Sequence, residues 1–154
     1  MTPRFAPFKI APDLIKALMG LETAIAAGGL EHSLAELVKL RAAQINRCAF
    51  CIHMHAAAAR AHGETEMRVF MLDAWRESPL YTDRERAALA WTEALTLVAE
   101  TGAPDADYVL IKSQFNEAEI VNLTVMIGAI NAWNRLQIAA RAVHPLPPAA
   151  KAVA

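Results

Sequence analysis

The sequence predicts an all-α protein, and three observations support this prediction. Alanine, the strongest helix former, accounts for 33 of the 154 residues. The chain shows no alternating strand pattern, whereas residues that start or end helices recur along it. Hydrophobic residues make up 55% of a chain long enough to fold without a structural disulfide or metal. We expect a compact bundle of about six to seven helices, forming one domain over residues 1–154 with its core at about 34–141.

The first two helices are predicted from the residues at their ends. Pro12 can open a helix that Gly28 ends, because proline favours the first helical turn and glycine the position after the last. Ser33 and Glu36 have the spacing of a capping box, in which side chains satisfy free backbone amides at a helix start. We expect the helix that they open to end at residues 46–47.

Three further helices are expected in the middle of the chain. One begins near Cys48 and runs to His62, and a shorter one covers about residues 65–75. Thr82 and Glu85 form a second capping-box pattern, which predicts the start of a long helix.

The remaining helices are predicted from similar signals. The long helix should stop at Gly102, and a short helix should follow over residues 104–111. Asn116 and Glu119 can cap a last helix that is apolar nearly all round, which is typical of a helix at the centre of a core or in a subunit interface. The proline-rich tail after residue 144 is expected to be loose.

The overall charge and the first residues of the chain narrow the class of protein. Fifteen basic residues against 16 acidic ones give a net charge of −1, which argues against a nucleic-acid partner. Residues 1–8 lack the apolar region of a signal peptide, and no segment is apolar enough to predict a membrane span. We therefore expect a cytoplasmic protein, in which two close cysteines are more often redox-active, catalytic or metal-binding than a structural disulfide.

Cys48 and Cys51 form the CxxC motif on which the functional prediction depends. If Cys48 opens a helix, then Cys51 and His55 follow at one-turn intervals on the same face. Residues three apart in a helix are about 5 Å apart between Cα atoms, within the span of a disulfide. The dipole at a helix start stabilises a thiolate, and His55 is within reach to accept the thiol proton.

Three interpretations of these residues remain open at this point. The cysteines could be small core residues, or they could bind zinc together with His53 and His55. A zinc site is disfavoured because His53 lies about 140° from Cys48 around the helix, so the four ligands would not converge. We favour a redox dithiol, and we expect no metal and no cofactor.

Glu36 lies twelve residues before Cys48, in the first turn of the preceding helix. If the two helices pack together, its carboxylate could approach His55 and hold the imidazole as a proton acceptor. The same glutamate could instead serve only as a helix cap.

The spacing of Glu36, Cys48, Cys51 and His55 resembles the signature of the alkylhydroperoxidase-D-like branch of the carboxymuconolactone decarboxylase family. The similarity extends over roughly residues 34–141. Three further segments resemble single-repeat members of this family, at residues 75–78, 83–90 and 131–135.

The resemblance implies an all-helical homo-oligomer, a trimer or hexamer, with thiol-dependent peroxidase activity. Cys51 would attack the hydroperoxide substrate and become a sulfenic acid, which Cys48 would resolve to a disulfide. His55 and Glu36 would relay the proton, and a dithiol or lipoyl-type reductant would reopen the disulfide. Phe50 stands where the prototype peroxidases carry a histidine, so we expect either a more apolar peroxide pocket or a weaker peroxidase.

Two other functions are compatible with the sequence. The family also contains lactone decarboxylases and isomerases, although these do not depend on a redox cysteine pair. A non-enzymatic redox sensor could use the same CxxC motif, and it would form its disulfide with peroxide but turn over poorly.

Overall fold

The computed structural model describes residues 2–145, which fold into nine α-helices without a strand. The helices are α1 Pro7–Ile10, α2 Pro12–Ala27, α3 His32–Ile45, α4 Ala49–Ala61, α5 Glu66–Met71, α6 Asp83–Thr96, α7 Val98–Thr101, α8 Asp105–Lys112 and α9 Glu117–Ala140. A 3-10 turn, Leu72–Ala74, follows α5. The all-α prediction is confirmed, and the four-residue helices α1 and α7 account for the excess over the expected seven.

Two of the three predicted capping boxes are present. The side chain of Thr82 accepts from the backbone N–H of Glu85, whose carboxylate accepts from the N–H of Thr82 at 2.8 Å. Asn116 and Glu119 make the same reciprocal pair at the start of α9. These helix starts could be predicted because both partners of each bond lie within one turn.

The predicted capping box of Ser33 and Glu36 is wrong. Helix α3 begins at His32, its N-cap is Glu31, and no side chain caps it. The carboxylate of Glu36 instead accepts a hydrogen bond from His55 on another helix. A tertiary contact has therefore taken the group that the local pattern assigned to the helix end.

The helix predicted to run from Thr82 to Gly102 is interrupted. At Leu97 the backbone leaves helical geometry, with φ −104° and ψ 30°, and separates α6 from α7. Gly102 then ends α7 in a left-handed conformation, as expected of glycine after a helix.

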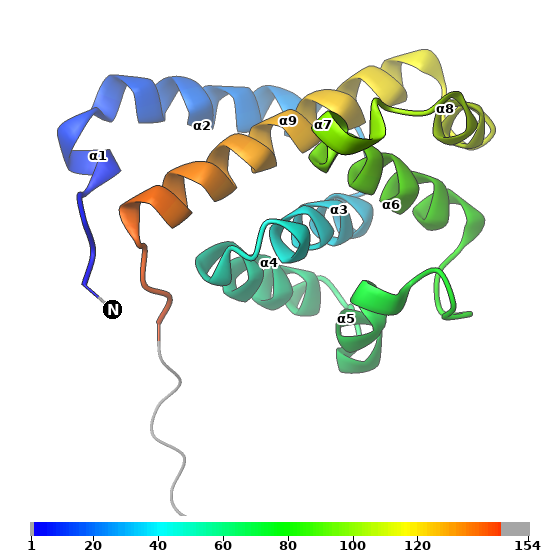
Figure 1. Cartoon of the computed structure of the whole chain (residues 1–154), viewed down its shortest axis with the longest axis horizontal. Helices are drawn as coiled ribbons and strands as arrows, with labels where there is room; N and C mark the ends of the chain where they lie inside the picture. The colour runs from blue at the N-terminus through cyan, green and yellow to red at the C-terminus, as the bar shows by residue number, and fades with distance from the viewer. Residues whose placement is uncertain (1, 146–154) are drawn as a thin grey trace, which may run out of the picture.

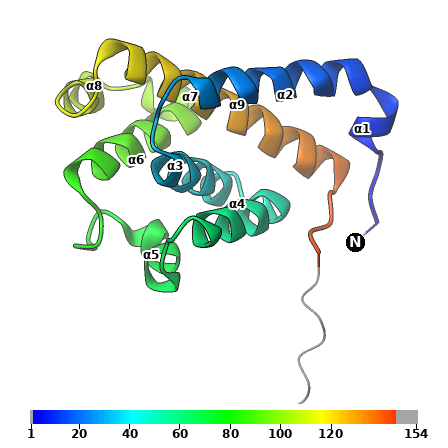
Figure 2. The same cartoon turned by 180° about the vertical axis from the view of Figure 1, so that it is seen from behind.

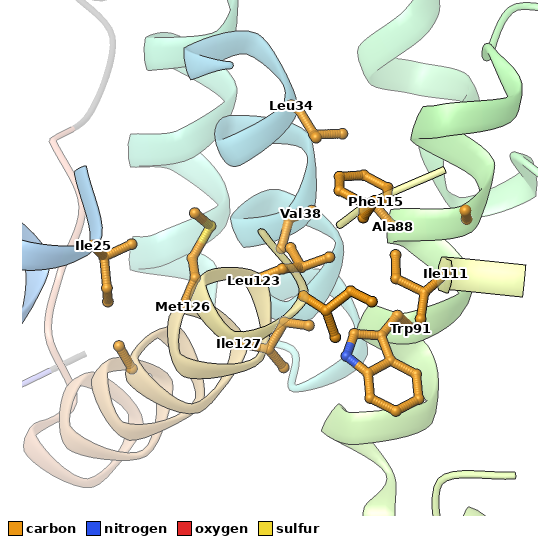
Figure 3. Close-up of a cluster of buried hydrophobic side chains, with 13 residues drawn as sticks. Ile25, Leu34, Val38, Ala88, Trp91, Ile111, Phe115, Leu123, Met126 and Ile127 are labelled. Atoms are coloured by element: carbon orange, nitrogen blue, oxygen red, sulfur yellow. The ribbon is translucent and has the colours of Figure 1, made fainter. Parts of the chain in front are cut away.

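Helix α3 lies at the centre of the arrangement, where it packs against α4, α6 and α9, while α2 lies along α9 (Figures 1 and 2). One core cluster joins α2, α3, α6, α8 and α9, and Figure 3 shows Val38, Leu123 and Ile127 meeting Trp91 and Ile111 within it. A second cluster lies on the other side of α3 and includes Leu37, Leu40, Leu72, Trp75 and Leu89. Helix α3 is thus fixed from both sides.

Helix α9 is only partly buried in the chain. Leu123 and Ile127 are in the core, whereas Val121 on the opposite side is 62% exposed.

Among residues 2–145, no helix combines the length and apolar character needed to cross a membrane. The tail predicted to be loose lies almost entirely outside the described residues.

Candidate active site

Cys48 and Cys51 form a disulfide at the start of α4. Cys48 is the N-cap residue of the helix, and Cys51 lies in its first turn. Their Cα atoms are 5.3 Å apart, and each residue is only 1% exposed. The predicted spacing therefore places the pair where one helical turn can hold either a dithiol or a disulfide.

Arg47 reverses the chain between α3 and α4. Its φ is 57°, and its N–H donates to the carbonyl of Gln44, while the N–H of Cys48 donates to the carbonyl of Ala43. These two bonds are those of a Schellman motif, a common way to end a helix. Because the turn is so short, α4 folds back onto α3 and brings its buried face against it.

Cys51 and His55 lie on that buried face of α4, one turn apart. The Nδ1 atom of His55 is 2.8 Å from Oε2 of Glu36 on α3, and both residues are 6% exposed. The structure thus brings together the four predicted residues, and the helix packing on which the Glu36 prediction depended is present.

The contact with Glu36 fixes the tautomer of His55. An ionised carboxylate only accepts, so Nδ1 carries a proton, and in the neutral imidazole Nε2 then has the free lone pair. Among the described residues, Nε2 of His55 is buried and has no hydrogen-bond partner. The imidazole therefore offers an unoccupied basic nitrogen on the face of the helix that also carries Cys51.

Glu36 is held in its charged form. Burial by itself raises the pKa of this carboxyl group, but the hydrogen bond from His55 and the nearby positive charges outweigh it and lower the pKa below its usual value. One of these charges is the ammonium group of Lys39, 3.9 Å from the other carboxylate oxygen. Lys39 also pairs with Glu22 of α2 at 3.3 Å, which links the first long helix to the site.

An amide cluster lies beneath the turn that precedes Cys48. The side-chain amide of Asn46 donates to Oδ1 of Asn134 at 2.8 Å and to Oδ1 of Asn131 at 3.0 Å, both on α9. Asn134 is fully buried. Asn131 and Asn134 thus connect α9 to the turn after α3, whereas Arg135 bonds back to Asn131 of its own helix.

A pocket of about 320 Å³ opens beside the disulfide. Cys48 and Phe50 line it, together with residues from the N-terminal segment and from the end of α9. Phe50 thus lines a pocket on the side of Cys48, while its predicted role in a peroxide pocket stays a prediction.

The other histidines lie apart from this group. His53 makes an edge-to-face contact with His144, with ring centroids 5.1 Å apart, so it points away from the relay. Nδ1 of His62 is 2.8 Å from the carbonyl oxygen of Ala58, as expected for a histidine at a helix end. Within residues 2–145, no group of three or more His, Cys, Asp or Glu residues is placed to hold a metal ion.

The sequence profile of the carboxymuconolactone decarboxylase family matches residues 12–94, more than half of the chain. The chain belongs to this family. The match covers α2 to α6 and thus includes the four residues of the candidate site, while α9 lies beyond it.

Two proteins are similar to this one over most of its length. The uncharacterized protein YdfG of Bacillus subtilis (strain 168) is 39% identical over 139 residues, which are 90% of this chain and 95% of YdfG. A crystal structure from Agrobacterium tumefaciens is 45% identical with a TM-score of 0.93, covering 95% of this chain and 100% of that one. That protein is described as being of unknown function, with a suggested assignment as the antioxidant defence protein AhpD.

A more distant structure supports the fold alone. The alkylhydroperoxidase AhpD core protein of Ralstonia eutropha JMP134, described as peroxidase-related, is 16% identical with a TM-score of 0.79. The alignment covers 90% of this chain and 74% of that protein. The family membership and the Agrobacterium tumefaciens relative fit a peroxidase-related role.

Sequence reasoning missed Lys39 and the arginines around the pocket. Lys39 sits one turn after Glu36, a spacing that could have pointed to it. Arg4 and Arg141 are 137 positions apart in the sequence, so no local pattern could have joined them.

Proposed function

We propose that this protein is a thiol-dependent peroxidase that reduces hydroperoxides through Cys51. The observation that carries the proposal is the buried bond between Glu36 and His55, on the face of α4 that holds Cys51. A structural disulfide would not need a paired histidine with a free, buried nitrogen beside it. A proton acceptor for a thiol does need such a nitrogen.

The first half of the reaction starts from the dithiol. Nε2 of His55 takes the proton of the Cys51 thiol, and Glu36 stabilises the imidazolium that forms. The thiolate then attacks the outer oxygen of the hydroperoxide, the O–O bond breaks, and the proton on His55 passes to the departing alkoxide. The products are an alcohol, or water from hydrogen peroxide, and a sulfenic acid on Cys51.

The second half regenerates the enzyme. The Cys48 thiol attacks the sulfenic acid, water leaves, and the disulfide seen in the structure forms. A dithiol reductant, free or of the lipoyl type, then reduces this disulfide by exchange and becomes a disulfide itself. Two electrons thus pass from the reductant to the peroxide in each cycle.

Peroxide consumption in the presence of a dithiol tests this assignment. Cys51→Ser should abolish turnover, whereas Cys48→Ser should still consume about one equivalent of peroxide, because the sulfenic acid can form without being resolved. Full activity in Cys51→Ser would exclude Cys51 as the attacking thiol. A redox sensor would instead oxidise normally and turn over slowly with every reductant.

Lactone decarboxylation or isomerisation is the competing activity within the family. It would not require the disulfide to open and close, so it should survive replacement of both cysteines by serine. Assaying the double variant with a lactone substrate separates this activity from the peroxidase.

We infer that the protein assembles as a homo-oligomer, a trimer or hexamer. Exposed apolar side chains on α9, including Val121, Val125 and Ile138, support this proposal. Light scattering at micromolar concentration should give a mass well above the 16.7 kDa of one chain. We also place the protein in the cytoplasm, whose thiol pools can keep a CxxC pair cycling.

A further inference from the structure

The pocket beside the disulfide is built from three distant parts of the chain. Arg4 comes from the N-terminal segment, Arg47 from the turn between α3 and α4, and Arg141 from the end of α9. The backbone N–H of Arg4 donates to the carbonyl of Ala140 at 2.9 Å, which holds the N-terminal segment against the end of α9 (Figures 1 and 2). Of the two cysteines, Cys48 lines the pocket and Cys51 does not.

The charged residues that line this pocket are all positive. Three arginines line it, and no carboxylate does. The ion pairs formed among residues 2–145 all involve other side chains, so none of these three guanidinium groups is neutralised. Phe50 and Ile138 add apolar surface. The pocket therefore suits a small ligand with an apolar body and an anionic group.

Two of the three arginines also have an unusual backbone conformation. Arg47 and Arg141 have φ values of 57° and 52°, in the left-handed region that favours glycine. Each occupies the residue after a helix in a Schellman motif, since the N–H of Arg141 donates to Ile138 and that of Ala142 to Gln137. The same motif at the end of α4 uses Gly63, with φ 98°.

The two Schellman motifs beside the disulfide thus have arginine at the left-handed position, whereas the motif at the end of α4 has glycine there. This choice strains the backbone, and it places two cations at the pocket next to Cys48. Ala103, with φ 51°, shares this conformation outside the pocket, so it is the placement of two such arginines at the pocket that points to a ligand.

We propose that this pocket binds the reductant, that the reductant is a small dithiol bearing a carboxylate, and that it attacks Sγ of Cys48. The arginines would bind the carboxylate, and one thiolate of the reductant would form a mixed disulfide with Cys48 while Cys51 leaves as a thiolate. The second thiol of the reductant then attacks its own sulfur in that mixed disulfide and releases Cys48. The reductant ends as a cyclic disulfide, and both cysteines are reduced.

The biological role of this pocket rests on the proposed function, because only a peroxidase cycle needs a reductant. The pocket then indicates which class of dithiol that reductant is. In this scheme the two sulfur atoms have different roles. Attack on Cys48 returns Cys51 as a thiolate on the face of α4 where His55 lies, ready for the next peroxide.

Dihydrolipoate and dihydrolipoamide are a matched pair of probes, because they share the dithiol and differ in carboxylate against neutral amide. The protein disulfide is formed with diamide, and its reduction is followed by counting thiols over time. Each rate is divided by the rate of the same probe with hydroxyethyl disulfide. We expect the wild-type protein to react about tenfold faster with dihydrolipoate, and the preference to shrink in high salt.

Variants of the arginines decide whether the pocket causes this preference. Arg47→Gln and Arg141→Gln should each lower the dihydrolipoate rate about threefold and the dihydrolipoamide rate clearly less, since only the attacking thiolate of the amide probe is charged. Lys16→Gln removes the same charge from an exposed residue outside the pocket and should change neither rate. If a variant at either helix end folds poorly, Arg4→Gln provides the same test, because Arg4 has no positive φ.

Equal normalised rates for the two probes would overturn the proposal, and so would arginine variants that slow both probes alike. Because diamide forms the disulfide, the measurement needs no peroxidase activity. A protein that shows the carboxylate preference but consumes no peroxide would refute the proposed function and leave this site in place.

Discussion

The two sides of the Cys48–Cys51 disulfide are built in opposite ways. On the side of Cys51, regular helices α3 and α4 pack together and bury Glu36 and His55 to 6% exposure. On the side of Cys48, helix ends and the N-terminal segment form an open pocket with unneutralised arginines. The first side is suited to moving a proton away from water, and the second to admitting a charged molecule. The two cysteines thus have different surroundings although they lie one helical turn apart.

The largest expected effect comes from breaking the buried side. His55→Gln should lower the kcat/KM for peroxide by about 100-fold, because a positioned proton acceptor contributes at least that much. Stopped-flow peroxide consumption measures this loss. His53→Gln is the matched control, since it lies on the same helix outside the relay and should keep near wild-type activity. Equal losses in both variants would show damage to α4 rather than loss of a relay.

The turn between the two sides should depend on the amide cluster. Asn46→Ala should lower the free energy of unfolding by about 1–3 kcal/mol, because it leaves the oxygen of fully buried Asn134 without its donor. Urea unfolding measures this change. Gln44→Ala, at a half-buried position just before the turn, should cost less than half as much. Similar losses in the two variants would contradict the role of the cluster.

The open side should gain stability when its strain is removed. Arg47→Gly and Arg141→Gly should each raise the free energy of unfolding by about 0.5–1 kcal/mol, because glycine adopts positive φ without steric cost. Gly63→Ala should lower it by about 1 kcal/mol for the same reason. Denaturant unfolding of the three variants tests this, and a loss of stability in both arginine variants would show that their φ values are not strained.

The smallest effect concerns pH. The pKa of Glu36 is lower in the folded protein than in the unfolded chain, so its ionisation stabilises the fold above pH of about 4.5. This contribution is lost as the pH falls through the folded-state pKa. Glu36→Gln should therefore lose less stability than the wild type between neutral pH and pH of about 3. The free energy of unfolding, measured by urea at each pH, could instead fall equally in the wild type and in Glu36→Gln. That result would mean that this carboxylate is not held in its charged form.

The sequence allowed the buried side to be predicted much better than the open side. Cys48, Cys51 and His55 share one helix, so their relative placement follows from helical periodicity. The approach of Glu36 could be anticipated because a two-residue break forces neighbouring helices together. The capping box assigned to Ser33 and Glu36 failed for the same reason, since the local pattern and the tertiary contact competed for one carboxylate.

The open side could not be predicted because its parts are remote in sequence and break local rules. Glycine is the usual sign of a left-handed residue after a helix, and it marks Gly63 and Gly102 correctly. Arg47 and Arg141 give no such sign, and nothing in the sequence connects them with Arg4. The interruption at Leu97 likewise follows no proline or glycine at that position.

The attachment of Arg4 to the end of α9 has a practical consequence for work with this protein. Arg4 lines the pocket. Two hydrogen bonds hold it there, one from its backbone N–H to the carbonyl of Ala140 and one from its guanidinium group to the carbonyl of Ala139 at 3.4 Å. Proteolysis that removes Arg4, or a tag inserted close to it, would therefore alter the surroundings of Cys48 directly. Kinetic comparisons of this disulfide should keep the segment around Arg4 identical in every sample.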